Sequence, residues 1–574
     1  MIPAGAHGCG GVRGAIASLA WAGAGALCFM AAFPPIDLWP LVAAVPAMLV
    51  LGARRSGGGW RGFLAIFVTQ WPMWFWMHRW LVDVTPIGWP LLAVFMAFWP
   101  ALTAALVVRL ERSGRLSNWP LAWLIPPIWV GLEYFRSDVF MDGYPWFQVG
   151  HPLIGWLPLA QSADLLGTSL LSLLVAMFSG ALLDGWRLMS RGEATSRRQP
   201  WCILALVITA LLLALNLGYG WWRLNQTISM RPGPVVLAIQ TNLPQSNKRA
   251  WTFEEQLEDM PRYARQTIEA RQGIEGPVDL VVWPETMAPG FGFEPQVMTM
   301  QKERGFLPGE LWHQLFLEVR ETVGAPILVG SPCRIGLGVD ESSGRPVYTW
   351  EAAYNSAYLM QGDMPYQRYD KIFLTPFGET MPYISHWDWL ERQLLALGAA
   401  GMRFDLDAGE RPVRLRLATD AGEVRLATPI CFEDTVARVV RRLVWEDGRK
   451  QADLLVNLSN DGWFGDHDPG RRQHVQAARF RSIENRLPMI RCANTGLSVA
   501  IDSTGKIIGV VETGRNTLMR APGHLVVRTT LDERKTLYGR IGNVLPTLCL
   551  AATVGLWWLG RRGKETDHAS NAVR

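Results

Sequence analysis

Three reactive side chains each stand beside an apolar segment that has the pattern of a buried strand. Glu285 follows Val-Val-Trp-Pro, Lys371 stands in a stretch rich in Tyr, Phe and Leu, and Cys431 follows Ala-Thr-Pro-Ile. A carboxylate at the rim of a sheet loses hydration, which raises its pKa and suits it to act as a general base. A lysine in apolar surroundings can hold a cation against a developing oxyanion, and a thiol can act as a nucleophile.

We expect a helix directly after Cys431. Asp434 and Thr435 are good N-cap residues, so the helix is predicted to begin there. The positive end of its dipole would lower the pKa of the thiol and favour the thiolate. Taken singly, the three reactive residues are more typical of a loop cap, a surface lysine and a buried structural cysteine. Together they make a base, an electrophilic stabiliser and a nucleophile, which is the set that acyl transfer through a thioester needs.

The segment 221–542, which holds all three, alternates strand-like and helix-like patterns. This alternation, followed by further strands, predicts one α/β domain in which helices cover packed sheets. Apolar runs of strand length occupy 235–241, 278–283, 326–330, 353–360, 423–430, 452–458, 489–493, 497–502 and 524–530. Helical periodicity fits 253–271, 310–323, 434–447 and 471–486.

The rest of the 574 residues is rich in long apolar runs. Only 18% of the chain is charged, whereas a typical soluble domain has about 25%, and this argues against a disordered, nucleic-acid-binding or purely soluble protein. A helix that spans a membrane needs about 20 apolar residues. We predict about eight such helices, at 14–33, 38–53, 60–78, 88–108, 119–135, 165–186, 201–220 and 543–560.

Basic residues are distributed unequally between the two sides of these helices. On one side, the short loops hold only Arg79 and Arg136. The other side holds Arg13, Arg54, Arg55, Arg61, Arg109, Arg112, Arg115, Arg187, Arg191, Arg197, Arg198, Arg561, Arg562 and Lys564. Such an excess marks the cytoplasmic side, so both termini are expected there. The predicted domains are a seven-helix transmembrane bundle at 1–220, the α/β domain on the outer side at 221–542, a last transmembrane helix at 543–560 and a cytoplasmic tail at 561–574.

Seven cysteines are scattered along the chain without a CxxC pair or a metal-ligand spacing. A zinc site and a disulfide scaffold are therefore not expected, and no cofactor is predicted. Cys333 and Cys492 could pair on an oxidising side of the membrane, but we expect them not to, because Cys492 lies in a run that fits a buried strand better. The net charge of +5 is modest for this length and indicates no nucleic-acid partner.

Further motifs accompany the three reactive residues and carry a family resemblance. They are Gln240-Thr-Asn-Leu-Pro-Gln245, Trp283-Pro-Glu285, Tyr369-Asp-Lys371, Pro376-Phe-Gly-Glu379, Ile430-Cys-Phe-Glu433, Asn457-Leu-Ser-Asn-Asp-Gly-Trp-Phe-Gly465, Gln473-His474, Arg479 and Arg491-Cys-Ala-Asn-Thr-Gly496, with Gly143-Tyr-Pro-Trp146 and Gln161-Ser-Ala-Asp-Leu-Leu-Gly167 nearer the N-terminus. On these motifs the α/β segment resembles the nitrilase, or carbon–nitrogen hydrolase, superfamily, whose Glu-Lys-Cys triad lies in an αββα sandwich. From about residue 14 to 560 the chain resembles the apolipoprotein N-acyltransferase family.

The resemblance implies a bacterial inner-membrane enzyme, with a periplasmic catalytic domain, that completes lipoprotein acylation. Cys431 would attack an acyl ester of a membrane phospholipid of the phosphatidylethanolamine type, while Glu285 takes the thiol proton and Lys371 stabilises the oxyanion. The α-amino group of the S-diacylglyceryl cysteine of a lipoprotein would then attack the thioester. The implied partners are therefore a phospholipid donor, a lipoprotein acceptor and the bilayer itself.

The resemblance also implies supporting residues. Glu379 and Glu433 match glutamates that would orient the lysine and the segment around the cysteine, and Phe432, Asn460 and Trp463 match supporting or substrate-positioning residues. Three positions depart from the family pattern without touching the triad. Phe432 stands where Tyr is common, Phe373 where His is common, and Arg249 where Trp is usual, so these departures bear on substrate positioning.

The stretch Thr380–Met402 contains several Trp and Leu residues. We predict that it forms an arm that dips into the membrane, the alternative being an ordinary surface helix. Two other functions remain open on sequence alone. The chain could be a membrane-tethered amidase of the nitrilase type, with water as the acceptor, or a non-catalytic membrane scaffold. The presence of Glu285, Lys371 and Cys431 together counts against the scaffold.

Overall fold

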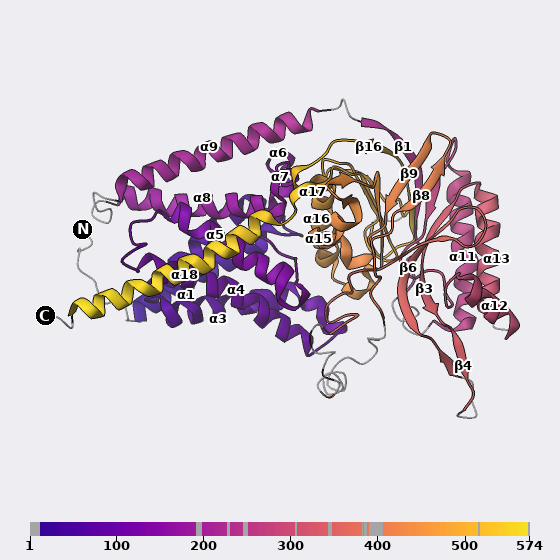
Figure 1. Cartoon of the computed structure of the whole chain (residues 1–574), viewed down its shortest axis with the longest axis horizontal. Helices are drawn as coiled ribbons and strands as arrows, with labels where there is room; N and C mark the ends of the chain where they lie inside the picture. The colour runs from indigo at the N-terminus through magenta and orange to yellow at the C-terminus, as the bar shows by residue number, and fades with distance from the viewer. Residues whose placement is uncertain are drawn as a thin grey trace. The chain divides into compact units, whose positions relative to one another are not determined.

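A computed structural model describes residues 12–190, 198–226, 230–244, 251–304, 307–342, 347–381, 383, 387, 389, 406–514 and 517–571 (Figure 1). The chain forms two compact units. One contains the chain up to Asn225 together with the part from Ile541 onwards, and the other is Gln226–Arg540.

The first unit is helical. Its longer helices are α1 (Val12–Ala32), α2 (Val45–Arg55), α3 (Gly59–Met77), α4 (Gly88–Glu111), α5 (Leu121–Tyr134), α8 (Thr168–Met189), α9 (Gln199–Leu224) and α18 (Val544–Asn571). Short helices connect them: η1 (Trp39–Ala44), η2 (Arg79–Asp83), η3 (Phe135–Val139), η4 (Phe140–Asp142), η5 (His151–Gly155), α6 (Leu157–Ala160) and α7 (Ala163–Leu166).

Five helices among the described residues are long and apolar enough to cross a membrane, namely α1, α4, α8, α9 and α18. The predicted number of about eight is therefore not confirmed. The predicted span 38–53 is divided between η1 and the 11-residue α2, and α5 has 14 residues before it passes into the π-helix η3. In α3, Arg61, Gln70 and several tryptophans lower the mean hydropathy of the 19 residues. The last helix continues past the predicted end at 560, to Asn571.

The second unit contains two six-stranded sheets. Their strand orders are β16-β1-β2-β3-β6-β7 and β15-β14-β13-β12-β9-β8. The inner pairs β1–β2, β2–β3, β9–β12 and β12–β13 are parallel, and the outer pairs are antiparallel. The first sheet comprises β1 (Met230–Gln240), β2 (Leu280–Val282), β3 (Ile327–Ile335), β6 (Ala352–Met360), β7 (Gln367–Asp370) and β16 (Gly523–Asp532). The second comprises β8 (Leu415–Thr419), β9 (Gly422–Ala427), β12 (Leu454–Ser459), β13 (Met489–Ala493), β14 (Val499–Ile501) and β15 (Ile507–Val510).

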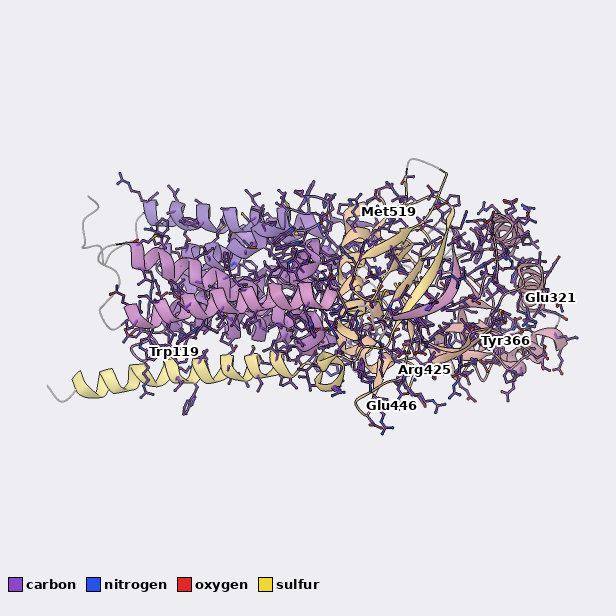
Figure 2. All side chains as sticks on the ribbon, turned by 90° about the horizontal axis from the view of Figure 1, so that it is seen from above. Trp119, Glu321, Tyr366, Arg425, Glu446 and Met519 are labelled. Carbon is purple, nitrogen blue, oxygen red and sulfur yellow. The ribbon has the colours of Figure 1, made fainter. Side chains whose placement is uncertain are left out.

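Helices cover the outer face of each sheet. On the first sheet, α11 (Phe253–Gln272) and α13 (Leu307–Val323) bury Tyr263 and Phe316 against Val281 and Ile327, and α12 (Pro295–Glu303) lies beside them (Figure 1). On the second sheet lie α15 (Ala437–Val444) and α16 (Asp468–Asn485), and α17 (Leu537–Ile541) ends the unit. Figure 2 shows Glu321 of α13 and Tyr366 towards one end of this unit, away from Arg425 of β9.

The two sheets pack face to face. The Cys492 thiol of β13 lies 3.3 Å from the carbonyl oxygen of Ile239 and 3.4 Å from that of Val282, which belong to the other sheet. The layers are therefore helix, sheet, sheet, helix, which confirms the predicted αββα sandwich. Cys333 and Cys492 are both unpaired thiols, as expected.

All nine predicted strand segments contain or overlap a strand, and each of the four predicted helices overlaps a helix. The prediction of a helix beginning at Asp434 is wrong. Cys431–Thr435 forms a short 3-10 turn, η7, and Val436 is extended, with φ −94° and ψ 98°, so α15 begins only at Ala437. Besides short edge strands such as β7, β8 and β15, two small hairpins were not predicted: β4 (Gly338–Asp340) with β5 (Val347–Thr349), and β10 (Trp445–Glu446) with β11 (Arg449–Lys450).

Candidate active site

Cys431 lies at a sharp turn just beyond β9. Ile430 still pairs with Leu458 of the neighbouring strand through an isolated bridge, and Cys431 then adopts a left-handed backbone conformation with φ 51°. This conformation is unfavourable for a residue with a Cβ, so surrounding contacts must hold it. The side-chain nitrogen of Asn457 donates to the carbonyl oxygens of Pro429 and Cys431, at 3.0 and 3.2 Å. The turn therefore presents the thiol at the end of the parallel core of the second sheet.

Glu285 lies at the end of β2 in the facing sheet. Its side chain is buried, and Oε1 accepts a hydrogen bond from the side-chain nitrogen of Asn355 on β6, at 2.8 Å. Gly330 of β3 lets the Glu285 segment pack closely, because a Cβ at position 330 would lie 2.6 Å from the Glu285 Cα. The strand end, the asparagine and the glycine together fix the position of this carboxylate.

Lys371 directly follows β7 and is also buried. Its backbone N–H donates to the carbonyl oxygen of Asn355 at 2.9 Å. Its Nζ donates to Oε2 of Glu379 at 2.6 Å and lies 3.4 Å from Oγ1 of Thr375. Asn355 thus contacts both Glu285 and Lys371, which are 86 positions apart in the chain.

Asn355 contacts both Glu285 and Lys371, and the Glu433 carboxylate links the backbone of Ile430 to that of Ile372. Glu285 and Lys371 also affect the pKa of Cys431, so the structure brings the three predicted residues into one site. Burial alone would lower the pKa of Lys371, but the Glu379 and Glu285 carboxylates raise it above its usual value. These carboxylates therefore favour the protonated, cationic form of Lys371. Burial of Glu379 is outweighed by Lys371, which lowers the pKa of the glutamate.

The pKa of the Cys431 thiol differs from the sequence-based prediction. Burial, and secondarily the Glu285 carboxylate, raise the pKa of Cys431 well above its usual value, and Lys371 opposes the rise only in part. The predicted lowering by a helix dipole is wrong, because η7 is a single turn and α15 begins six residues later. Cys431 is consequently a neutral thiol in the resting protein, and a nearby base has to take its proton.

Glu433 connects the turn of Cys431 to the segment after Lys371. Its fully buried carboxylate accepts hydrogen bonds from the backbone N–H groups of Ile430 at 2.7 Å, and of Ile372 and Phe373 at 2.9 Å. The hydroxyl of Tyr369 also donates to it, at 2.9 Å. Burial raises the pKa of Glu433 to about 7, against the opposing effects of Lys371 and these donors.

Two of the positions that depart from the family pattern lie together. The rings of Phe373 and Phe432 are both buried and stack with their centroids 6.3 Å apart, and the Arg438 guanidinium lies 4.8 Å from the Phe373 centroid. The third position, Arg249, lies outside the described residues. Most of the predicted arm Thr380–Met402 does so as well, and within it Trp387 and Trp389 are 68% and 70% exposed.

Asn460 and Trp463 belong to the turn after β12. Asn460 is buried, and its side-chain oxygen accepts from the backbone N–H of Gly462 at 3.2 Å and from the side-chain nitrogen of Asn494 at 3.1 Å. Trp463 is half-buried in the 3-10 turn η8 (Asp461–Phe464). Sequence reasoning did not single out Asn355, although an asparagine inside the apolar run 353–360 was a signal that could have drawn attention to it.

The chain is similar to proteins of known families. Residues 24–181 match the family model for the apolipoprotein N-acyltransferase N-terminal domain, and residues 237–522 match the one for carbon-nitrogen hydrolase. A solved amidase of the nitrilase superfamily from Nesterenkonia AN1 aligns with 51% of this chain and 91% of its own, at 15% identity and a TM-score of 0.31.

Full-length relatives also match. The apolipoprotein N-acyltransferase of Geobacter metallireducens is 30% identical over 552 residues, which cover 93% of this chain and 94% of the relative. That of Rhodopseudomonas palustris is 29% identical over 573 residues and covers 94% of each chain. At this identity and coverage, the chain belongs to the apolipoprotein N-acyltransferase family.

Proposed function

We propose that this protein is a membrane apolipoprotein N-acyltransferase that moves a fatty acyl chain from a phospholipid to a lipoprotein through a thioester on Cys431. The observation that carries the proposal is the placement of a half-buried thiol, a buried carboxylate and a buried lysine ammonium in a single site of the αββα unit. Membership of the family supports the substrate class.

In the first half of the reaction, the Cys431 sulfur attacks the carbonyl carbon of a phospholipid acyl ester. Glu285 takes the thiol proton as the S–C bond forms, because the thiol is neutral at rest. The Lys371 ammonium stabilises the negative charge on the tetrahedral oxygen. The C–O bond then breaks, Glu285 returns the proton to the departing oxygen, and a lysophospholipid leaves the acyl-enzyme.

In the second half, the α-amino group of an S-diacylglyceryl cysteine attacks the thioester carbon. Glu285 takes one proton from the nitrogen as the N–C bond forms, and Lys371 again faces the oxyanion. The C–S bond breaks, the sulfur regains the proton, and the product is an amide. Glu379 keeps Lys371 charged and oriented, and we assign Phe432, Asn460 and Trp463 to positioning the substrates.

Glu433 holds the two segments that carry the reactive groups. Its contacts with Ile430 and Phe373 tie the backbone before Cys431 to the backbone after Lys371. Loss of this tie would let the thiol and the ammonium drift apart, and acyl transfer depends on their mutual position.

The same proposal gives the bundle eight crossings, with both termini in the cytoplasm of a bacterial inner membrane and the catalytic unit in the periplasm. The excess of basic residues on one side of the apolar segments supports this topology. Both substrates are anchored by acyl chains, and each buried CH₂ contributes about 0.8 kcal/mol to that anchoring. A site that opens near the bilayer surface avoids the cost of moving these acyl chains into water. The exposed Trp387 and Trp389 fit a membrane-facing arm.

The test uses the full chain in vesicles of phosphatidylethanolamine with labelled acyl chains. Without an acceptor we expect one labelled thioester, located on Cys431 by mass spectrometry. Addition of a diacylated lipopeptide should move the label to its α-amino group. Cys431→Ser should lose both signals, whereas Cys333→Ser, which removes another thiol of the same unit, should keep them. Hydrolysis of simple amides with no labelled lipopeptide would favour the amidase instead.

A further inference from the structure

Four ionisable side chains that the proposed reaction does not use lie buried next to the turn of Cys431. Asp434 belongs to η7, Asp461 to η8, His474 to α16 and Arg491 to β13. Each is at most 2% exposed. We call these four residues the ionic cluster.

Arg491 and Asp461 form the core of the ionic cluster. The two terminal nitrogens of the guanidinium donate to the two carboxylate oxygens, at 2.9 and 2.7 Å. The arrangement is the bidentate one in which arginine binds carboxylates most strongly. The remaining nitrogen, Nε, lies 3.4 Å from Oδ2 of Asp434. Because Asp461 directly follows Asn460, the pair also fixes the start of η8.

His474 joins the two aspartates. Its Nε2 lies 2.7 Å from Oδ1 of Asp434, and its Nδ1 lies 3.1 Å from Oδ1 of Asp461 and 2.9 Å from a guanidinium nitrogen of Arg491. The ring therefore links the turn that follows Cys431 to the turn that contains Trp463.

The ionic cluster also reaches the nucleophile electrostatically. The Asp461 carboxylate contributes to the raised pKa of Cys431. Burying ionised groups is costly, and apolar side chains of the same volume often give equal or greater stability. A role in positioning the turns around Cys431 and Trp463 explains this arrangement better than a contribution to the stability of the fold does.

We propose that His474 is a positioning residue for acyl transfer, which holds the Cys431 turn through Asp434 in register with the Asn460–Trp463 turn through Asp461. This inference rests on the proposed function and deepens it. His474 contacts Asp434 and Asp461, and it acts on the reacting sulfur only through them. Loss of the His474 side chain should leave phospholipid binding unchanged but displace the Cys431 sulfur. A displacement of about 1 Å can slow a reaction about a hundredfold.

The experiment measures acyl-enzyme formation by the full-length protein in labelled phosphatidylethanolamine vesicles. The final amplitude gives the fraction of folded, competent sites, and the rate constant gives the chemistry per site. For His474→Ala we expect the rate per site to fall about a hundredfold, with the amplitude and the KM for phospholipid retained. His474→Gln keeps a donor towards Asp434, so it should recover most of the rate.

His313 provides the matched control. It is a buried histidine of the same unit, on α13, and its Nε2 lies 2.8 Å from the hydroxyl of Tyr366. His313→Ala should keep the wild-type rate per site. A loss of amplitude at unchanged rate in His474→Ala, or equal rates in His474→Ala and His474→Gln, would overturn the positioning role. Failure of the wild-type protein to form any acyl-enzyme would instead refute the proposed function.

Discussion

Asn355 donates a hydrogen bond from its side-chain nitrogen to Oε1 of Glu285, at 2.8 Å. The carbonyl oxygen of the same residue accepts the backbone N–H of Lys371 at 2.9 Å. One residue of β6 thus sets the separation between the proposed base and the proposed cation. The side-chain contact can be removed without changing the backbone contact, which makes it testable.

Asn355→Ala should slow acyl-enzyme formation about 10- to 100-fold, because a hydrogen bond to a charged group contributes about 1.5–3 kcal/mol. Single-turnover labelling of Cys431 measures this rate. Asn485→Ala is the control, since Asn485 is a buried asparagine of the same unit that accepts from the Trp445 indole at 3.0 Å. If both variants lose rate equally, the contact with Glu285 has no special role.

The titration of the thiol is the second prediction. The pKa of Cys431 should lie above the value of about 8.5 that is usual for cysteine, because burial and Glu285 favour the neutral form. Glu285→Gln removes a negative charge and should lower this pKa, whereas Lys371→Ala removes a positive charge and should raise it. The rate of iodoacetamide modification at Cys431, followed against pH by mass spectrometry, measures each value. Shifts in the same direction for both variants would contradict the charge arrangement.

Glu433→Gln should impair both stability and acyl transfer. The carboxylate accepts hydrogen bonds from Tyr369 and from three backbone N–H groups. In the glutamine variant, the amide NH₂ would face these donors, which should lower the free energy of unfolding by about 1–3 kcal/mol.

The pH dependence of this effect has a definite sign. Burial raises the pKa of Glu433 from 4.5 to about 7 in the folded protein. The folded state then binds more protons than the unfolded state between these values, so stability from this group falls as the pH rises from 4.5 to 7. The difference in unfolding temperature between wild type and Glu433→Gln should therefore be larger at the lower end of this range. A difference that grows with pH would refute the assignment.

Gly496 lies against the ionic cluster, where there is no room for a side chain. A Cβ at this position would lie 2.2 Å from Oδ2 of Asp461, so Gly496→Ala should displace the carboxylate from Arg491 and slow acyl-enzyme formation about a hundredfold. Gly273 ends α11 with a negative φ and has no atom closer than 3.6 Å to such a Cβ. Gly273→Ala should have no effect, and an unchanged rate in Gly496→Ala would show that the cluster tolerates displacement.

The number of crossings can be decided with alkaline phosphatase fusions, because this enzyme forms its disulfides only outside the cytoplasm. With eight crossings, a fusion after Arg115 follows four spans and is inactive, whereas a fusion after Asn225 follows seven and is active. With only α1, α4, α8, α9 and α18 as spans, both positions lie on the same side. Equal activity of the two fusions would therefore overturn the eight-crossing topology.

The sequence alone was sufficient to predict the strands that carry Glu285 and Cys431, because a buried strand is a local run of apolar residues. It also indicated the apolar helices, for the same reason. The short edge strands β7, β8 and β15 were missed, and β8, for example, alternates buried and exposed residues over only five positions. The predicted helix after Cys431 was wrong because Val436 turns out extended, and local N-cap preferences do not determine that.

The tertiary structure decided how the site is held together and how it is charged. Asn355 meets Glu285 across 70 positions and Asp434 meets His474 across 40, and no local pattern predicts such pairs. The pKa of Cys431 likewise depends on burial and on carboxylates that come from other strands. Residue types and local periodicity are properties of short segments, whereas desolvation and hydrogen-bond geometry exist only once distant segments pack together.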